Sequence, residues 1–213
     1  MSLTIDHKPR IHELVTRARA EVSRFLIPPE KLNSEQAKHI IRRYTAAFYG
    51  NFVNWCSAAI ISSRSNLGNE IATANWRIEL TDNHPFLLLI FARTNDAYPQ
   101  GADYEFNRKN IELINEAVIA LNSPFTFGLI ALLENTSLEF IPYLKSLEKR
   151  LGMQRPSRYL QVHGEADAIH ASAFLDALVE EVKIEQDPCS IRTVEEAKLR
   201  VVNLIRNIFT ENL

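Results

Sequence analysis

The segment from residue 159 to residue 178 constrains this chain most, because it places polar, proton-accepting side chains on the apolar side of a helix. Its sequence, YLQVHGEADAIHASAFLDAL, contains His163, Asp167 and His170 in the pattern H-x-x-x-D-x-x-H. At about 100° per residue, these three side chains fall within roughly 60° of one another. Leu160, Phe174 and Leu178 share that side. The segment therefore predicts a helix whose inward face carries three groups that need partners.

These three groups admit two interpretations, because a carboxylate or imidazole left unpaired in apolar surroundings costs several kcal/mol. One is a buried His–Asp–His hydrogen-bond network, and the other is a metal site. The two histidines lie seven residues apart, about 10.5 Å along a helix axis, which is long for two ligands of one ion. Asp167 can serve either end. A carboxylate followed by a histidine three residues later is typical of di-iron carboxylate bundles, so two ions fit better than one.

The composition limits the classes of protein to which the chain can belong. With 213 residues, 46% hydrophobic and 23% charged, it is typical of a soluble globular protein, and we expect one domain over residues 1–213. The formal net charge is -2 and no clustering of basic residues is evident, so nucleic acid is not expected as a partner. The longest apolar run, residues 86–92, is far shorter than the roughly 20 residues of a membrane span. The polar N-terminus and two distant cysteines predict a cytoplasmic protein with reduced thiols.

Helical periodicity extends along the chain and no segment alternates with period two, so we expect an all-α protein. A bend is expected at Gly50, and connections between helices are short. These features predict a compact bundle of seven or eight helices, with any functional pocket between them. The helices are expected over residues 10–26, 33–61, 66–80, 85–98, 104–122, 125–151, 159–178 and 193–208.

Further candidate site residues lie on three of these helices. Glu134 falls about 40° from the core residue Ile130, which predicts an inward carboxylate. Glu70 and Arg77 flank the apolar stripe expected for residues 66–80, and taken alone they indicate a surface ion pair. Tyr44 is a candidate for contacting a ligand, although aromatic residues at helical spacing are more often core. The stripe of residues 66–80 is expected to contain Leu67, Ile71, Ala74 and Ile78.

Together these residues resemble the haem-oxygenase-like superfamily, which includes TenA, PqqC and non-haem di-iron oxidases. The likeness rests on NLGNE at residues 66–70, on the inward Glu134 and on YLQVHGEADAIHA from residue 159. It is most similar to the CADD-like branch. There the ligands are a glutamate, a histidine seven residues later, a distant second glutamate and then H-x-x-x-D-x-x-H. The resemblance implies that the metal ligands are Glu70, Glu134, His163, Asp167 and His170.

The sequence departs from this pattern at one position, because the residue seven after Glu70 is Arg77. An arginine offers no lone pair to a metal. Its guanidinium could instead neutralise the surrounding carboxylates, or hold the carboxylate of a substrate. His84 is the nearest substitute, but it stands beside Pro85 in an expected turn. The sequence thus leaves open whether two ions, one ion or none is bound.

The resemblance implies a non-haem oxidase that uses iron, or manganese, and O2 to oxidise a small organic substrate, with Arg77 and Tyr44 as catalytic candidates. Two imidazoles with carboxylates suit ferrous iron. A homodimer is common for this fold and is expected here. The alternative, favoured by Arg77, is a metal-free member: a PqqC-like oxidase or a small-molecule-binding bundle. A TenA-like hydrolase would need Cys56 as its nucleophile and ranks last, because the context of Cys56 indicates buried core.

Overall fold

The computed structural model of the protein describes residues 7–185, 187 and 189–210. Over these residues the chain forms nine α-helices and one short 3₁₀ helix, with no strand, so the prediction of an all-α fold is confirmed. No helix in the described part combines the length and the apolar character that a membrane span requires. The helices are α1 (Lys8–Phe25), α2 (Ser34–Phe48), α3 (Asn51–Ser62), α4 (Asn66–Thr81), α5 (His84–Thr94), α6 (Gly101–Ile119), α7 (Ser123–Arg150), α8 (Arg158–Glu185) and α9 (Ser190–Thr210).

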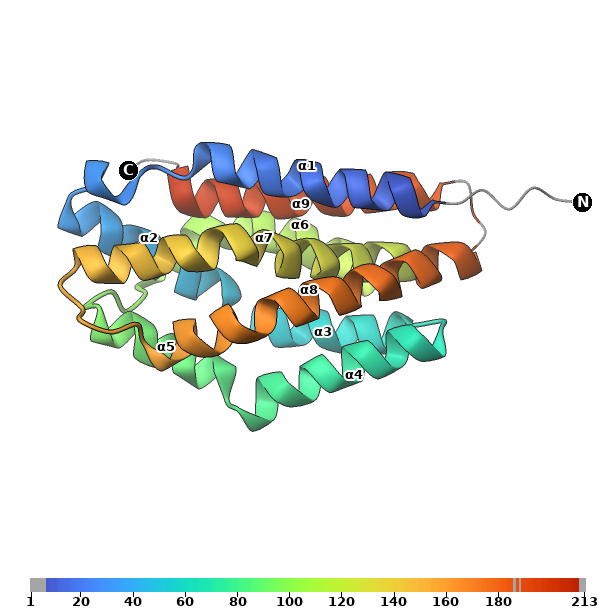
Figure 1. Ribbon diagram of the computed structural model, residues 1–213, viewed down its shortest axis with the longest axis horizontal. Helices are drawn as coiled ribbons and strands as arrows, with labels where there is room; N and C mark the ends of the chain where they lie inside the picture. Colours follow the sequence, from blue (N-terminus) through green and yellow to red (C-terminus); the bar gives the residue numbers. More distant parts are fainter. Residues whose placement is uncertain (1–6, 186, 188, 211–213) are drawn as a thin grey trace, which may run out of the picture.

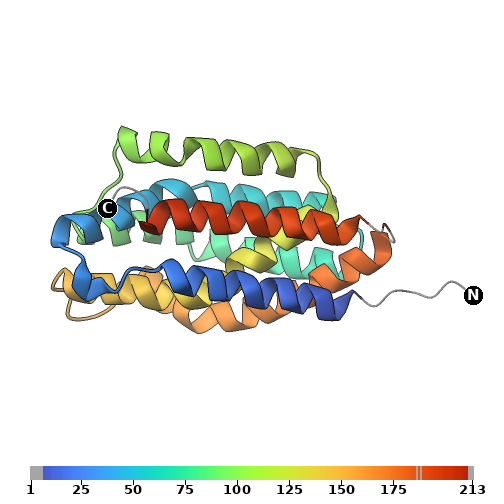
Figure 2. The same cartoon turned by 90° about the horizontal axis from the view of Figure 1, so that it is seen from above.

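Helix α7 lies at the centre of the bundle, and most other helices run along its length (Figure 1). It contacts α8, α9, α1 and α3, and residues 123–137 are all buried. A helix that is buried on every side is one enclosed by other helices rather than one facing solvent. Helix α6 lies outermost in the view of Figure 2. The central position of α7 explains why Glu134, halfway along it, is an inward carboxylate as predicted.

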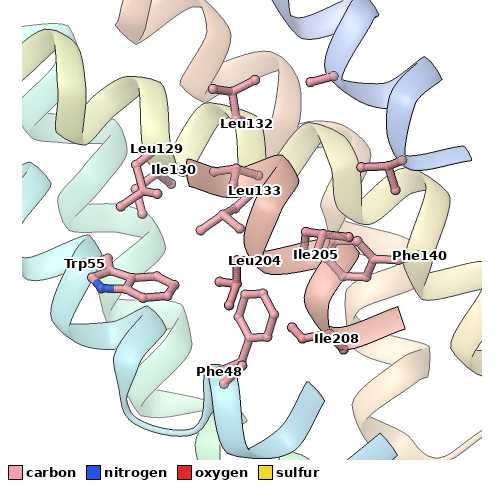
Figure 3. Close-up of a cluster of buried hydrophobic side chains, with 14 of the residues drawn as sticks. Phe48, Trp55, Leu129, Ile130, Leu132, Leu133, Phe140, Leu204, Ile205 and Ile208 are labelled. Atoms are coloured by element: carbon pink, nitrogen blue, oxygen red, sulfur yellow. The ribbon is translucent and has the colours of Figure 1, made fainter. Parts of the chain in front are cut away.

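The apolar core packs α2, α3 and α9 against α7. Figure 3 shows Phe48 and Trp55 facing Leu133 and Phe140, with Leu204 between them. Each of these side chains is at least nine-tenths buried. Burying an aromatic or leucine side chain contributes about 1.5–3 kcal/mol, so this contact holds three helices to the central one.

A single glycine divides the segment that was expected to form one helix over residues 33–61. Gly50 has φ of +78°, a left-handed conformation that residues with a Cβ rarely adopt. Helix α2 therefore ends at Phe48, and α3 begins at Asn51. This break raises the number of described helices to nine.

The buried face of α4 differs from the stripe expected from its apolar residues. Leu67 is 42% exposed and Ile78 is 37% exposed, so the expected stripe is wrong. A side chain at position 68 would collide with the carboxylate of Glu181 on α8. A small residue is therefore needed at position 68, where α4 meets α8. With Gly68 on the buried face, the larger apolar residues Leu67 and Ile78 lie toward solvent. The residues of α4 that are buried are Gly68, Ala72, Asn75 and Glu79.

The Glu181 carboxylate fixes the entrance to α4. It is fully buried and accepts hydrogen bonds from the Ser65 hydroxyl (2.6 Å) and from the backbone N–H groups of Arg64 and Ser65 (2.9 Å each). The hydroxyls of Ser63 and Ser123 also donate to it. Burial alone would raise the pKa of Glu181, but these hydrogen bonds together hold it below the ordinary value. One carboxylate on α8 thus ties the α3–α4 connection and the start of α7 together.

We expect Glu181→Gln to lower the free energy of unfolding by about 2–3 kcal/mol, because an amide NH₂ would face N–H and O–H donors and leave buried groups unpaired. Urea unfolding at neutral pH measures this change. Glu180→Gln is the matched control, since Glu180 is partly exposed and, among the described residues, its ion pair is with Lys183. Its effect should stay within about 0.5 kcal/mol. Equal effects of the two variants would refute the role of Glu181.

The same carboxylate predicts a pH dependence. Its pKa is lower in the folded chain than the ordinary value of 4.5, so its contribution to stability is complete above about pH 4.5 and is lost as the pH falls through the folded-state pKa. The gap in unfolding free energy between the natural protein and Glu181→Gln should therefore be constant near neutral pH and shrink in acid. Urea titrations across this range measure it. A gap that widens on acidification would contradict the assignment.

Candidate metal centre

Helix α8 presents the three predicted polar side chains toward α7 and α5. Asp167 is buried, and the side chains of His163 and His170 are each only 16% exposed. The inward orientation predicted from the helical period is confirmed for all three. Phe174 and Leu178, which were expected on the same side, are also buried.

Asp167 is anchored from both sides. One carboxylate oxygen accepts a hydrogen bond from the Ser137 hydroxyl of α7 at 2.6 Å. The other lies 3.3 Å from Nδ1 of His163. A histidine whose Nδ1 faces a carboxylate keeps its Nε2 lone pair for another partner. Nε2 of His163 is buried and has no hydrogen-bond partner among the described residues.

The corner between α4 and α5 (Figure 1) carries a second histidine, His84, whose ring centroid lies 4.9 Å from that of His163. Asn83 occupies the left-handed region with φ of +55°, a conformation that asparagine tolerates better than most residues. The chain therefore turns sharply, and Glu79 in the last turn of α4 meets His84 at the first position of α5. The Glu79 carboxylate lies 2.9 Å from His84 Nδ1. Nε2 of His84 is again buried without a partner among the described residues.

Glu134 on α7 lies between these two groups. Its carboxylate is 3.9 Å from Nδ1 of His170 and accepts a long hydrogen bond of 3.5 Å from the amide of Asn75. Burial raises the pKa of Glu134 well above its ordinary value, and the nearby charges of Asp167 and Glu79 raise it further. Glu134 is thus held by weaker contacts than its burial would normally demand.

A small cavity opens between these groups and an apolar wall. It holds about 50 Å³ of open space, which is room for a few water-sized groups at most. Tyr44 contributes to the wall, and its hydroxyl lies 2.7 Å from the hydroxyl of Tyr159. Glu79, His84, Glu134, His163 and Asp167 line the cavity on the polar side. The apolar lining includes Phe48, Phe52, Val53, Leu88, Leu133, Phe140 and Ile141.

The electrostatics of the site are unusual because three carboxylates are buried around one cavity. Glu79, Glu134 and Asp167 are each at most 5% exposed, and no lysine or arginine is among the described residues that line the cavity. Burial alone would lower the pKa of His84, but the hydrogen bond and charge of Glu79 raise it overall. Burial lowers the pKa of His170. The site has an excess of negative charge that a cation would neutralise.

These residues fit a bound metal. One atom each from Glu79, His84 and His163 lies within 4.8 Å of the others. Two buried imidazole nitrogens without partners are the donors that iron, manganese and zinc accept. Glu134, Asp167 and His170 stand directly beside this group and offer a second set of two carboxylates and one imidazole. The arrangement therefore has the donors for one or two ions.

The structure brings four of the five predicted ligands together, and the fifth lies elsewhere. Glu70 and Arg77 are exposed on α4 and do not line the cavity. The geometry thus gives no support to a guanidinium occupying a metal position. Glu70 and Arg77 are exposed because Gly68 and Ala72 face the core side of α4. This rotation of α4 about its axis places Glu79 on the buried face instead. Tyr44 does line the cavity, as its assignment to the site requires.

The sequence interpretation missed Glu79 and His84 as a pair. It sought a glutamate and a histidine seven residues apart on one helix, whereas the pair is five residues apart across a turn. A usable signal was present in Asp82-Asn83, two residues that favour turns, followed by His84 and by Pro85 in the first turn of a helix. This signal predicts a sharp turn of the chain between the two side chains.

Cys56 lies behind the site rather than in it. Its thiol is fully buried and receives a long contact of 3.6 Å from the Asn75 amide. Burial raises the pKa of Cys56 well above its ordinary value, and the charges of Glu79 and Glu134 add to this effect. A thiol with a raised pKa is a poor nucleophile near neutral pH.

Comparison with known proteins agrees with this geometry. A family model described as iron-containing redox enzyme matches residues 45–204, more than half of the chain. The chain belongs to this family. The matched segment includes all six candidate metal ligands but begins one residue after Tyr44, and the family lies in the haem-oxygenase-like superfamily that the sequence resembles. Searches of curated proteins and of solved structures gave no match.

We expect His84→Ala and Glu79→Ala to lose bound Fe(II), because each removes a donor from the group of three. The affinity should fall by more than the about 10–100-fold typical of a lost supporting residue. Anaerobic loading followed by elemental analysis measures the iron per chain. Glu70→Ala and Arg77→Ala are the controls on the same helix and should retain the natural content. Loss of iron in these controls instead would favour the original ligand assignment.

Proposed function

We propose that this chain is a non-haem iron oxidase or oxygenase, similar to the CADD-like branch, that uses O2 to oxidise a small organic substrate. The observation that carries the proposal is the pair of buried Nε2 atoms of His84 and His163, which have no partner among the described residues and belong to side chains that line a cavity together with three carboxylates. Membership of the iron-containing redox enzyme family supports iron as the metal.

We assign two iron positions to the six donors. Glu79, His84 and His163 would hold one ion, and Glu134, Asp167 and His170 would hold the other. Three imidazoles and three carboxylates suit ferrous iron, and carboxylates also suit manganese. Ser137 supports this assignment because its hydrogen bond fixes the Asp167 carboxylate. Asn75 does the same for Glu134.

When bound, ferrous iron supplies the electrons that reduce O2. The protein's own contribution is to place the substrate and to keep water out. The wall formed by Phe48, Leu133 and Phe140 is apolar and well packed. Such a wall favours an apolar part of a substrate and raises the strength of electrostatic interactions at the polar side. The small volume limits entry to a slender or terminal part of the molecule.

Tyr44 and Tyr159 form the polar feature of the apolar wall. Burial raises the pKa of both phenols, so both stay protonated near neutral pH. Only one of the two hydroxyl protons is needed for the bond between them, so the pair retains a proton to donate to a group in the cavity. The Tyr159 ring also packs against His163, with ring centroids 4.5 Å apart. We assign to this pair the orientation of His163 and the delivery of a proton.

The other functions considered for the sequence have less support. A metal-free oxidase or binding bundle was favoured by Arg77, which does not line the cavity. A TenA-like hydrolase would require a reactive thiolate, and burial raises the pKa of Cys56. The expectation of a homodimer and of a cytoplasmic location stays part of this proposal.

The proposal is tested by loading the chain anaerobically with Fe(II) and then admitting O2. We expect two iron ions per chain and measurable O2 consumption, followed with an oxygen electrode. His163→Ala should lose both, because its imidazole lies between the two groups. Manganese loading run in parallel identifies the preferred metal. A folded chain that takes up neither metal would refute the proposal.

We expect Tyr44→Phe to keep its iron and to consume O2 at least about tenfold more slowly, because loss of a proton-delivering group costs catalysis on this scale or more. Elemental analysis and the oxygen electrode measure the two quantities separately. Tyr143→Phe is the control, because its hydroxyl lies on the same bundle outside the cavity lining. Unchanged O2 consumption in Tyr44→Phe would remove Tyr44 from the site's chemistry.

A further inference from the structure

The turn between α7 and α8 carries a concentration of positive charge. Between residues 143 and 164 the sequence contains five cations and a single acid, Glu148. The expectation that basic residues do not cluster is wrong for this stretch, because five of the 14 residues from 145 to 158 are lysine or arginine. We call them the basic turn: Lys145, Lys149, Arg150, Arg155 and Arg158.

The salt bridges of the described residues include none for the five cations of the basic turn. Glu148 is 1% exposed and directs its carboxylate inward to the Asn95 amide and the Ser157 backbone N–H, at 2.9 Å each. Among the described residues, no carboxylate lies within ion-pair distance of any of the five cations. Arg150 makes one hydrogen bond, to the backbone carbonyl of Leu32.

Cations elsewhere in the described chain frequently have acidic partners. Arg10, Arg17 and Lys198 on α1 and α9 pair with glutamates, and Lys38 pairs with Asp96. The basic turn differs because none of its five cations has an acidic partner among the described residues. Lys149, Arg150, Arg155 and Arg158 are all exposed. Lys145, Lys149 and Arg155 also line a depression in the surface there.

The basic turn ends where α8 begins, five residues before His163 of the candidate metal centre. Arg158 is the first residue of α8, and Tyr159 is buried directly after it. Tyr159 packs against His163, which is one helical turn further on, about 6 Å along the axis. A donor docked on the basic turn would thus be separated from His163 by the Tyr159 ring and one turn of helix.

We propose that the basic turn is the docking surface for a small acidic one-electron carrier protein that reduces the metal centre. This inference rests on the proposed function, because an oxidase that reacts with O2 has to regain electrons when its substrate does not supply all of them. In each transfer the carrier loses one electron and a ferric ion in the site gains it to become ferrous. No bond is made or broken in the protein.

The chemistry of the surface favours an acidic protein over nucleic acid. Complementary charge accelerates encounter and fixes orientation between proteins. Five cations on one turn are fewer than the 6–10 phosphate contacts through which proteins commonly hold DNA. The overall net charge of -2 also opposes general binding to polyanions. The basic turn is also next to Tyr159, which packs against His163, so a carrier docked there would be close to the metal centre.

Binding can be tested on the metal-free chain, so that the result does not depend on activity. The probes are an oxidised plant-type [2Fe–2S] ferredoxin and an oxidised flavodoxin, titrated at ionic strengths of about 0.02 M and about 0.5 M. We expect at least one carrier to bind at low ionic strength and to be released at the higher. The double variant Lys149→Glu with Arg155→Glu should bind at least tenfold more weakly. When this double variant is loaded separately with Fe(II), it should take up as much iron as the natural chain, because neither residue lines the centre.

The matched control is Lys109→Glu with Arg192→Glu, which changes the net charge equally at exposed positions on α6 and α9. Its affinity should change less than twofold, and equal losses in the two double variants would overturn the docking site. A chain that loads iron and consumes O2 but binds neither carrier would overturn the docking proposal and leave the proposed function intact. Tighter binding of a short DNA duplex than of either carrier would also overturn it. A chain that takes up no iron would refute the proposed function, and the docking proposal would fall with it.

Discussion

The structure depends on how each buried carboxylate obtains its stabilising partners. Glu181 is surrounded by hydroxyl and N–H donors that lower its pKa, and Glu148 receives two strong hydrogen bonds. Both carboxylates are stabilised by hydrogen bonds from the protein itself and need no ligand. In contrast, Glu134 has one long hydrogen bond and a raised pKa. Burying a carboxylate without adequate partners costs several kcal/mol. Glu134 at the cavity therefore differs from Glu181 and Glu148 because a bound cation would stabilise it further.

The two kinds of carboxylate are physically connected through α4. Glu181 fixes the residues that lead into α4, and Gly68 allows the helix to approach α8 closely. That approach sets the rotation of α4 about its axis. The rotation turns Asn75 and Glu79 inward, and it leaves Leu67 partly exposed. Apolar burial on α4 is thus reduced in favour of polar groups at the centre, a compromise that is common at functional sites.

Much of the candidate site was predictable, because helical period alone determines which residues of one helix share a face. His163, Asp167 and His170 were assigned inward on this basis, and so was Glu134. The pairing of Glu79 with His84 could not be obtained in this way, since the two residues belong to different helices. Their proximity depends on the left-handed conformation of Asn83. Helical periodicity gives the relative directions of side chains within one helix, and it does not relate residues on two helices.

The sequence by itself determined the all-α class, the inward face of α8 and the resemblance to an iron-containing family, because these follow from local spacing and residue type. Only the tertiary structure decided which face of α4 is buried, since this depends on the fit between Gly68 and α8. Only the tertiary structure revealed the cavity and the exposure of the cations in the basic turn, because both depend on which residues of other helices lie nearby. Local spacing specifies the direction of a side chain from its own helix, and packing between helices specifies what that side chain meets.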